Sequence, residues 1–505
     1  MNDVINIELL PLGKTLSIER GASLQDALFS EGVEFPCGGR GRCKGCRIKV
    51  LTGSATPTAD DERLIAPAEL AEGWRLACRV APAEDLQIEL AQWDATILAD
   101  DTAFAFVPDE GLGVAVDLGT TTVVAQLLDL RTGHVLAVRT ALNVQARHGA
   151  DIMSRIDFAL ANGGQQILET LIREQIGGLV QALLATIHGR ETDLKHVVIV
   201  GNTVMHHLFS GISVEPLSHH PFDSGGDGLR LFKADDLNWS LPGSPHARFL
   251  PCLGGFVGSD ILAGILASKL HERDDLSVLV DLGTNGEIVV GNRHRLLCAS
   301  TAAGPAFEGA RISMGMRAAT GAISEVSVRE GRLHCHVLGN QTPRGICGSG
   351  LVDAVAGALE LGSVQPSGRL SQGAPLALAP PVVVTQTDIR ELQLAKGAIA
   401  AGIQLLLEQW GAAREEVERV YLAGAFGNYI SRASARRIGL INFPGDKVQA
   451  AGNTALLGAK LALFGLREHD GSFADLVARI EHVSLNDDPR FHEVYVELMG
   501  FPSSA

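Results

Sequence analysis

Four cysteines near the N-terminus constrain the fold more strongly than any other feature of the chain. Five residues separate Cys37 from Cys43, two separate Cys43 from Cys46, and 31 separate Cys46 from Cys78. Such spacing places three thiols on one tight loop and brings the fourth from a distant strand. A [2Fe–2S] cluster needs this arrangement, because each of its irons takes two terminal sulfur ligands. The spacing therefore predicts that these four cysteines hold a [2Fe–2S] cluster.

The other residues of this loop suit a cluster. Its glycines let the backbone wrap closely around the sulfurs; they are Gly38, Gly39, Gly41 and Gly45. A zinc ribbon is the alternative, but it usually has two CxxC pairs, and only Cys43 and Cys46 form one. Cations are interleaved with the ligands, where they form either a solvated loop or a docking patch for an acidic partner. They are Arg40, Arg42, Lys44 and Arg47.

The segments around the cysteines predict a small α+β domain. Residues 5–10 and 14–19 alternate as two strands, Ser23 precedes a short helical stretch, and residues 86–90 read as a closing strand. This order is similar to that of β-grasp ferredoxins, and the spacing of five residues after the first cysteine is similar to that of adrenodoxin-like members. We expect a ferredoxin-type domain over residues 1–93 and an acidic linker over 94–110.

A five-residue motif occurs twice in the remainder of the chain. VDLGT stands at residues 116–120 and again at 280–284, in each case after an apolar run and before another strand. Two copies of one strand–turn–strand unit predict a duplicated α/β architecture with a cleft between its halves. We expect these halves to cover residues 111–275 and 276–505.

The turns of this motif have the chemistry of a phosphate site. Free amides and hydroxyl groups can bind phosphate oxygens, and an aspartate at a strand end can hold Mg²⁺ or orient a water molecule. Asp117 and Asp281 are therefore the candidate catalytic residues, and we expect them to face each other across the cleft. The candidate phosphate-binding residues are Gly119, Thr120, Thr121, Gly283 and Thr284.

Two later segments extend this pattern. Residues 420–428 read as a strand that runs into a glycine turn, and residues 451–459 read as a helix of small residues. With the repeated motif they resemble, in order, the ASKHA superfamily of acetate and sugar kinases, Hsp70 and actin. The resemblance implies phosphate segments at 113–122 and 279–288, an adenosine segment at 420–428 and a hinge helix near 451–465. It implies bound ATP with Mg²⁺, with Gly304, Gly424 and Gly427 among the nucleotide-binding residues. Ordinary strand ends in another α/β fold are the alternative.

The whole chain resembles the reductive activators of corrinoid-dependent methyltransferases. Besides the domain order, the resemblance rests on NVQARHGAD at 143–151, SRI at 154–156, VGNTVMHH at 200–207, AGPAFEG at 303–309 and ICGSGL at 346–351. Two features depart from some members. Residues 94–110 are too few for an additional small domain. Some members carry a C-terminal cysteine-rich [4Fe–4S] segment, whereas no cysteine follows Cys347 here.

The resemblance implies an ATP-dependent enzyme that transfers one electron from its [2Fe–2S] cluster to a corrinoid protein and returns Co(II) to Co(I). It also implies an upstream low-potential electron donor. Two alternatives stay open. One is a plain electron-transfer protein whose ASKHA module only docks a partner, and the other is a small-molecule kinase with a redox-sensing domain.

Composition and charge limit the classes of partner that this chain can bind. A net charge of −16 and a pI near 5.5 disfavour nucleic acid and anionic membranes, which need a basic face. The sequence has neither an apolar stretch long enough to span a membrane nor a secretory signal, so we expect a cytoplasmic protein. The histidine pairs at 206–207 and 219–220 are expected in the core or at the surface. Cys252, Cys298, Cys335 and Cys347 are expected to be buried thiols; a second cluster shared between the subunits of a homodimer is the alternative.

Overall fold

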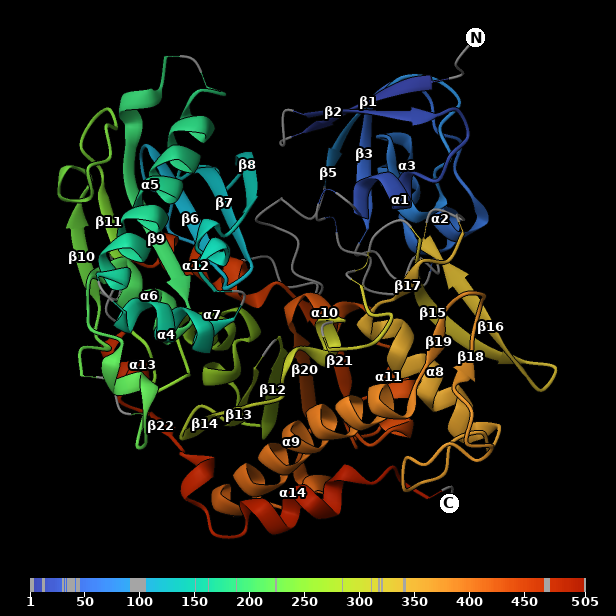
Figure 1. Ribbon diagram of the computed structural model, residues 1–505. Helices are drawn as coiled ribbons and strands as arrows, with labels where there is room; N and C mark the ends of the chain where they lie inside the picture. The colour runs from blue at the N-terminus through green and yellow to red at the C-terminus, as the bar shows by residue number, and fades with distance from the viewer. Residues whose placement is uncertain are drawn as a thin grey trace.

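Figure 1 shows the computed structural model, with the N-terminal domain at the upper right and the two halves of the larger module at the left and below. The described residues are 4–503 without 11–13, 30, 32, 34–40, 42–45, 91–105, 150, 162, 188, 223–224, 284, 310, 317, 319–320, 339–341 and 467–472. None of the helices in these ranges is both long and apolar enough to cross a lipid bilayer.

The N-terminal domain is a mixed sheet with strand order β2-β1-β5-β3-β4. β1 pairs antiparallel with β2 and parallel with β5, so the first and last strands of the domain lie side by side. The strands predicted at 5–10, 14–19 and 86–90 are confirmed. The elements are β1 (Val4–Leu10), β2 (Lys14–Glu19), α1 (Leu24–Phe29), β3 (Arg47–Thr52), α2 (Ala59–Leu64), α3 (Pro67–Ala71), β4 (Trp74–Leu76), the 3₁₀ turn η1 (Ala77–Arg79) and β5 (Leu86–Leu90).

The first half of the larger module is a sheet with order β10-β11-β9-β6-β7-β8. β6, β7 and β8 form an antiparallel meander, and β9 and β11 add parallel strands on the other side of β6. Helix α5 packs against β7 and β8. The elements are β6 (Leu112–Leu118), β7 (Thr122–Asp129), β8 (Val135–Leu142), α4 (Ile152–Leu160), α5 (Gly164–Leu184), β9 (Leu194–Gly201), α6 (Thr203–Ser210), β10 (Arg230–Lys233) and β11 (His246–Phe249).

The second half repeats this topology. In the order β21-β20-β12-β13-β14-β22, the meander β12–β14 again lies beside two parallel strands, β20 and β21. The predicted duplication is therefore confirmed. The elements are β12 (Ser277–Leu282), β13 (Gly286–Gly291), β14 (Leu296–Thr301), α8 (Gly348–Glu360), α9 (Gln386–Trp410), β20 (Arg419–Ala423), α10 (Gly424–Tyr429), α11 (Arg432–Arg437), β21 (Val448–Gly452), α13 (Ala474–Val477), β22 (Ile480–His482) and α14 (Phe491–Met499).

Smaller strand pairs complete the second half. β15 (Ala322–Arg329) and β16 (Arg332–Val337) form a hairpin, and β15 also pairs in parallel with β17 (Gly345–Ile346). The proline-containing stretch near residue 380 folds between β18 (Leu376–Ala377) and β19 (Val383–Val384).

A pair of helices lies between the two sheets: α7 (Ser259–Ser268) and α12 (Thr454–Phe464). The central strands are covered on both faces. Because side chains alternate along β6, Val114 and Val116 lie in the core on the face of the first sheet away from α7 and α12, and Ala115 lies in the core on the face that carries these helices. The two helices touch closely: a Cβ on Gly458 would lie 2.0 Å from the carbonyl oxygen of Ala263. The small residues predicted to favour tight packing therefore lie at this contact.

Candidate functional site

The end of the β3–β4 ladder brings two of the predicted cluster ligands together. Arg47 pairs with Leu76, so Cys46 lies directly before β3 and Cys78 lies in η1 directly after β4. The amide of Ala77 donates a 2.9 Å hydrogen bond to the carbonyl of Cys46. Cys46 is buried and Cys78 is half-buried, as suits thiolates that would face a cluster. Cys37 and Cys43 lie outside the described residues.

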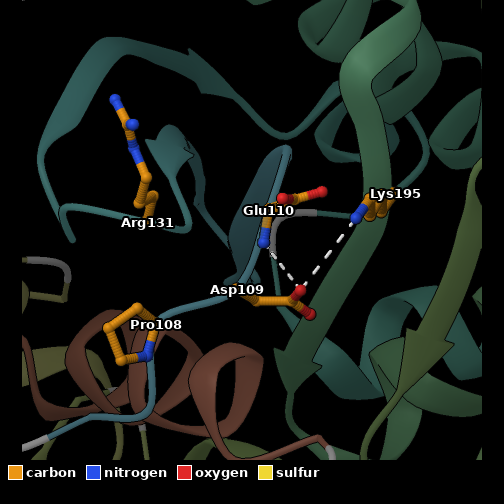
Figure 2. A pocket seen from close by; sticks show the side chains of 5 residues that line it. All are labelled: Pro108, Asp109, Glu110, Arg131 and Lys195. Carbon is orange, nitrogen blue, oxygen red and sulfur yellow. Dashed lines mark hydrogen bonds and ion pairs between the residues drawn. The ribbon is translucent and has the colours of Figure 1, made fainter.

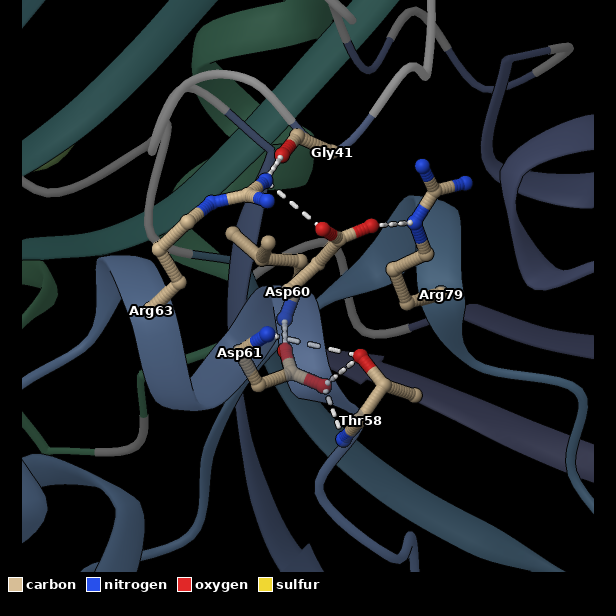
Figure 3. Close-up of polar contacts among 7 residues, drawn as sticks. Gly41, Thr58, Asp60, Asp61, Arg63 and Arg79 are labelled. Carbon is tan, nitrogen blue, oxygen red and sulfur yellow. Dashed lines mark hydrogen bonds and ion pairs between the residues drawn. The ribbon is translucent and has the colours of Figure 1, made fainter.

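Helix α2 supports this end of the sheet (Figure 3). Thr58 is the N-cap residue of α2, and the fully buried Asp61 completes a capping box with it. The carboxylate of Asp61 accepts a 2.7 Å hydrogen bond from the backbone amide of Thr58. The same carboxylate accepts a 2.7 Å bond from the amide of Leu76, two residues before Cys78. Since this carboxylate fixes α2 to β4, Asp61 links the fold of the domain to the position of one ligand strand.

The first aspartate motif forms a tight turn between β6 and β7. Asp117 lies near the end of β6, and the amide of Gly119 donates a 3.0 Å bond to the carbonyl of Thr122. The second motif also forms a turn, between β12 and β13: Asp281 lies near the end of β12, and the amide of Gly283 donates a 3.1 Å bond to the carbonyl of Asn285, two residues on instead of three. Thr284 lies outside the described residues.

Three polar side chains hold the first turn. Nη2 of the fully buried Arg155 donates to the carbonyl of Thr120 at 2.5 Å, and Nδ2 of Asn202 donates to the Thr120 hydroxyl at 2.9 Å. Nδ2 of Asn143 donates to the carbonyl of Gly119 at 2.9 Å. These residues belong to stretches that carry the family resemblance, but no sequence pattern indicates a role for each of them. The structure shows that they converge on the turn at Gly119 and Thr120.

Asn453 joins the two halves at the same place. Its Oδ1 accepts a 2.8 Å bond from the amide of Leu456 and so caps the first turn of α12. Its Nδ2 donates a 3.0 Å bond to Oδ2 of Asp117. One side chain therefore connects the start of the helix between the sheets with the aspartate of the first motif.

Four carboxyl groups gather near the ends of β6 and β12. Asp281 pairs directly with Glu287 across the β12–β13 ladder, and Asp260 lies in the first turn of α7. Burial raises the pKa of Asp117 to about 6, despite the hydrogen bond from Asn453. Burial and the charge of Asp117 raise the pKa of Asp281 to about 7.

The other two carboxyls are affected in the same direction. Burial, followed by the charges of Asp281 and Asp117, raises the pKa of Asp260 to about 8. Burial, followed by the charges of Asp260 and Asp281, raises the pKa of Glu287 well above its usual range. Like charges this close are unfavourable unless protons or a cation compensate them. Within the described ranges, no three His, Cys, Asp or Glu residues are arranged as a ready metal-ligand set.

The glycines predicted to bind nucleotide have different surroundings, and Gly424 is the one that lies against Asp281. Gly424 has a φ of +79°, and a Cβ there would lie 2.5 Å from Oδ1 of Asp281, so only glycine fits between β20 and this aspartate. Gly427, within helix α10, instead packs against Leu422 of the preceding strand β20. Gly304 has a φ of +78° and faces open space, with no atom within 4 Å of the position that a Cβ would take.

A pocket lined mainly by polar side chains lies at the opposite end of the strands of the first sheet (Figure 2). It is lined by Pro108, Asp109, Glu110, Arg131 and Lys195, and Nζ of Lys195 lies 4.0 Å from Oδ1 of Asp109. β6 runs from this pocket to Asp117, and a seven-residue strand is roughly 20 Å long. The pocket is therefore separate from the carboxyl cluster.

The remaining cysteines and histidines are distributed as follows. Cys252, Cys298 and Cys347 are buried, as predicted, whereas Cys335 on β16 is only half-buried. Burial raises the pKa of the Cys298 thiol beyond the normal range, which favours an inert thiol. Among the histidine pairs, 206–207 lies fully inside the core and 219–220 lies at the surface.

Known protein families match the N-terminal domain and both halves of the larger module. Residues 7–83 match the 2Fe-2S iron-sulfur cluster binding domain, residues 112–273 match the RACo middle region, and residues 275–505 match the C-terminal domain of RACo, the ASKHA domain. The corrinoid activation enzyme RamQ of Eubacterium limosum is 35% identical over 416 residues, which cover 76% of this chain and 69% of RamQ. The [Co(II) methylated amine-specific corrinoid protein] reductase of Methanosarcina barkeri is 27% identical and covers 76% of each chain.

A solved structure agrees along the whole length. The reductive activator for corrinoid,iron-sulfur protein superposes with a TM-score of 0.69 at 26% identity and covers 99% of both chains. Fold and site together define a protein with a ferredoxin-type [2Fe–2S] domain joined to an ASKHA module. More particularly, the chain belongs to the family of corrinoid reductive activators.

Proposed function

We propose that this chain reactivates a corrinoid protein by transferring one electron that returns Co(II) to Co(I), and that ATP drives the transfer. The observation that carries this proposal is that one chain combines two structures. The first is the cysteine pair at the end of the β3–β4 ladder, and the second is the carboxyl cluster between two duplicated sheets. The relatives named as corrinoid activation enzyme and corrinoid protein reductase support the same activity.

ATP is needed if the cobalt centre has a lower reduction potential than the electron donor, because the transfer then costs free energy. For a one-electron couple each ~59 mV corresponds to ~1.4 kcal/mol, so an uphill step of order 100–200 mV costs about 2.5–5 kcal/mol. A bound [2Fe–2S] cluster supplies a one-electron carrier. The proposed thiolate ligands of this cluster are Cys37, Cys43, Cys46 and Cys78.

The nucleotide roles follow from the turns. We assign the binding of Mg²⁺, or the orientation of a water, to Asp117 and Asp281, because their carboxylates end the two central strands. Mg²⁺ commonly uses one or two carboxylates together with waters and substrate phosphates, so a ready set of protein ligands is not required. The phosphates are assigned to Gly119, Thr120, Thr121, Gly283 and Thr284, and the rest of the nucleotide to Gly304, Gly424 and Gly427.

The wider setting is part of the same proposal. The chain would receive electrons from a low-potential donor, act in the cytoplasm and, in one arrangement, form a homodimer. Its domain limits would be residues 1–93, 94–110, 111–275 and 276–505. Because the chain is acidic overall, we propose neither nucleic acid nor a membrane as a partner.

The nucleotide assignment is tested with Asp281→Asn. The substitution keeps the size of the side chain but removes the charge that would hold Mg²⁺. We expect ATP-dependent reduction of a corrinoid protein to fall at least tenfold, while the visible absorption of the cluster is unchanged. Asp446→Asn is the matched control, because Asp446 is exposed in the same half. Wild-type ATP-dependent activity in Asp281→Asn would contradict the assignment.

A further inference from the structure

Asp60 forms two ion pairs beside the cysteine loop (Figure 3). It lies on α2, next to the buried Asp61. Its Oδ1 lies 2.6 Å from Nη2 of Arg63, and its Oδ2 accepts a 2.7 Å bond from Nε of Arg79. The two arginines are far apart in sequence, so this one carboxylate connects α2 with the segment that follows β4.

Each arginine reaches one part of the predicted ligand set. Nη2 of Arg63 donates a 2.7 Å bond to the carbonyl of Gly41, which lies between Cys37 and Cys43 in the sequence. Arg79 directly follows Cys78 in η1. Asp60 therefore ties the loop that carries three of the cysteines to the segment that carries the fourth.

The loop packs directly on this ion pair. Gly41 is buried and has a φ of +63°. A Cβ at Gly41 would lie 2.4 Å from Oδ2 of Asp60 and 2.7 Å from Nε of Arg79. The backbone approaches the charged groups so closely that no side chain fits between them. The side chain of Arg63 is 59% exposed, but Asp60 and Arg79 pack directly against the buried backbone of Gly41.

The charges matter as well as the geometry. Reduction adds one negative charge to an iron–sulfur cluster, so nearby cations favour the reduced form and nearby anions oppose it. Arg63 and Arg79 carry two positive charges next to the ligand segments, and the Asp60 carboxylate compensates one of them. A neutral residue in place of Asp60 would make the net charge beside the ligand segments more positive by one unit.

We infer that Asp60 is a positioning residue for the cluster, which anchors the cysteine loop to the Cys78 segment and keeps the reduction potential low. This role concerns the electron and does not depend on ATP. The neighbouring Asp61 carries the fold of α2 through its helix cap and its bond to Leu76, so Asp60 can be changed while that support stays in place.

The test is a redox titration of the full-length, cluster-containing protein, with dithionite as reductant and the visible absorption of the cluster as the signal. Asp60→Asn should favour the reduced form on the order of tenfold, which is about 59 mV for one electron. It should also release iron to a chelator faster than the wild type. Glu62→Gln is the matched control, since Glu62 is exposed on the same helix and the charge change is equal.

A second variant makes the sign of the shift decisive. Arg63→Gln removes a cation and should move the potential in the opposite direction, towards lower values. Asp60→Glu restores the charge and should return the potential towards that of the wild type. If Asp60→Asn and Glu62→Gln had the same potential and iron-release rate as the wild type, the inference would be overturned while the proposed function stood. A wild-type chain without cluster absorption would overturn the ligand assignment and this inference together.

Discussion

At the scale of single residues, the carboxyls of Asp117 and Asp281 make the protein sensitive to pH. Burial raises the pKa of Asp117 to about 6, and burial with the charge of Asp117 raises that of Asp281 to about 7. An aspartate whose pKa is higher in the folded than in the unfolded chain takes up a proton on folding. Its contribution to stability is therefore largest at low pH and falls as the pH rises towards 7.

The direction of these pKa shifts predicts how Mg²⁺-ATP affects stability. Mg²⁺ binds the deprotonated carboxylates and competes with protons, so the nucleotide should stabilise the protein more at pH 8 than at pH 6. Thermal unfolding with and without Mg²⁺-ATP at both pH values measures this difference. In Asp281→Asn, the stabilisation by Mg²⁺-ATP should differ much less between pH 6 and pH 8. This variant is also the control for protonation of ATP itself, which is the same with both proteins. An equal nucleotide-induced shift at both pH values in the wild type would contradict the assignment of these carboxyls.

Some residues of the site could be predicted from sequence, and others could not, for a physical reason. Asp117 and Asp281 belong to a local pattern, an aspartate at the end of an apolar strand before a glycine turn. Arg155 and Asn453 work through contacts with residues 35 and 336 positions away, so no local pattern marks them. Glu287 belongs to neither group, because its place beside Asp281 appears only when β12 and β13 pair.

At the scale of elements, α12 connects the proposed nucleotide site with both halves of the larger module. Its first turn is capped by Asn453, which also bonds to Asp117. In the sequence α12 comes after β21 of the second half. In space it packs on α7 and on the strands β6 and β9 of the first half. The sequence predicts a helix from about residue 451. The structure starts it at Thr454, because residues up to Gly452 pair with β20 as β21.

Substitutions of Asn453 should separate its two bonds. Asn453→Ser keeps an oxygen that can cap the helix but loses the amide that donates to Asp117, whereas Asn453→Ala loses both. We expect the unfolding free energy of Asn453→Ser, measured by urea denaturation, to lie within a few tenths of a kcal/mol of the wild type. Asn453→Ala should be destabilised by about 1 kcal/mol.

The bond to Asp117 should be visible in the pH profile of ATP hydrolysis. The amide hydrogen bond lowers the pKa of Asp117, so its loss should move the acid limb of the profile to higher pH in both variants. If Asn453 only stabilised the fold, its substitution would leave the pH profile of ATP hydrolysis unchanged. If both variants retained the wild-type profile, the link between Asn453 and Asp117 would have no part in nucleotide use.

At the scale of the whole molecule, α10 and β8 of the larger module touch the N-terminal domain, and α10 begins at Gly424 of the proposed nucleotide site. Tyr429, the last residue of α10, is packed against the core of the N-terminal domain, and its hydroxyl donates a 3.5 Å bond to the carbonyl of Val33. Val138 of β8 is buried in the same core. Phe106, before β6, packs against Phe464 at the end of α12 with ring centres 4.5 Å apart.

These contacts connect elements near the proposed nucleotide site with the N-terminal domain. A nucleotide that moved α10 or α12 would act on Tyr429 or Phe464, and through them on the N-terminal domain and the segment that follows it. Both modules could be predicted from their sequence motifs, but the sequence contains no signal for their contact. The residues that make it are ordinary aromatic and aliphatic side chains from distant parts of the chain.

The absorbance change from Co(II) to Co(I) tests most directly whether this chain uses ATP to reduce a corrinoid protein. The measurement uses the full-length, cluster-containing protein, dithionite as reductant and the corrinoid protein of a methyltransferase system, with and without Mg²⁺-ATP. We predict that Co(I) formation is at least tenfold faster or more complete with Mg²⁺-ATP. Equal Co(I) formation with and without the nucleotide, or none with any corrinoid protein of this kind, would contradict the proposed function.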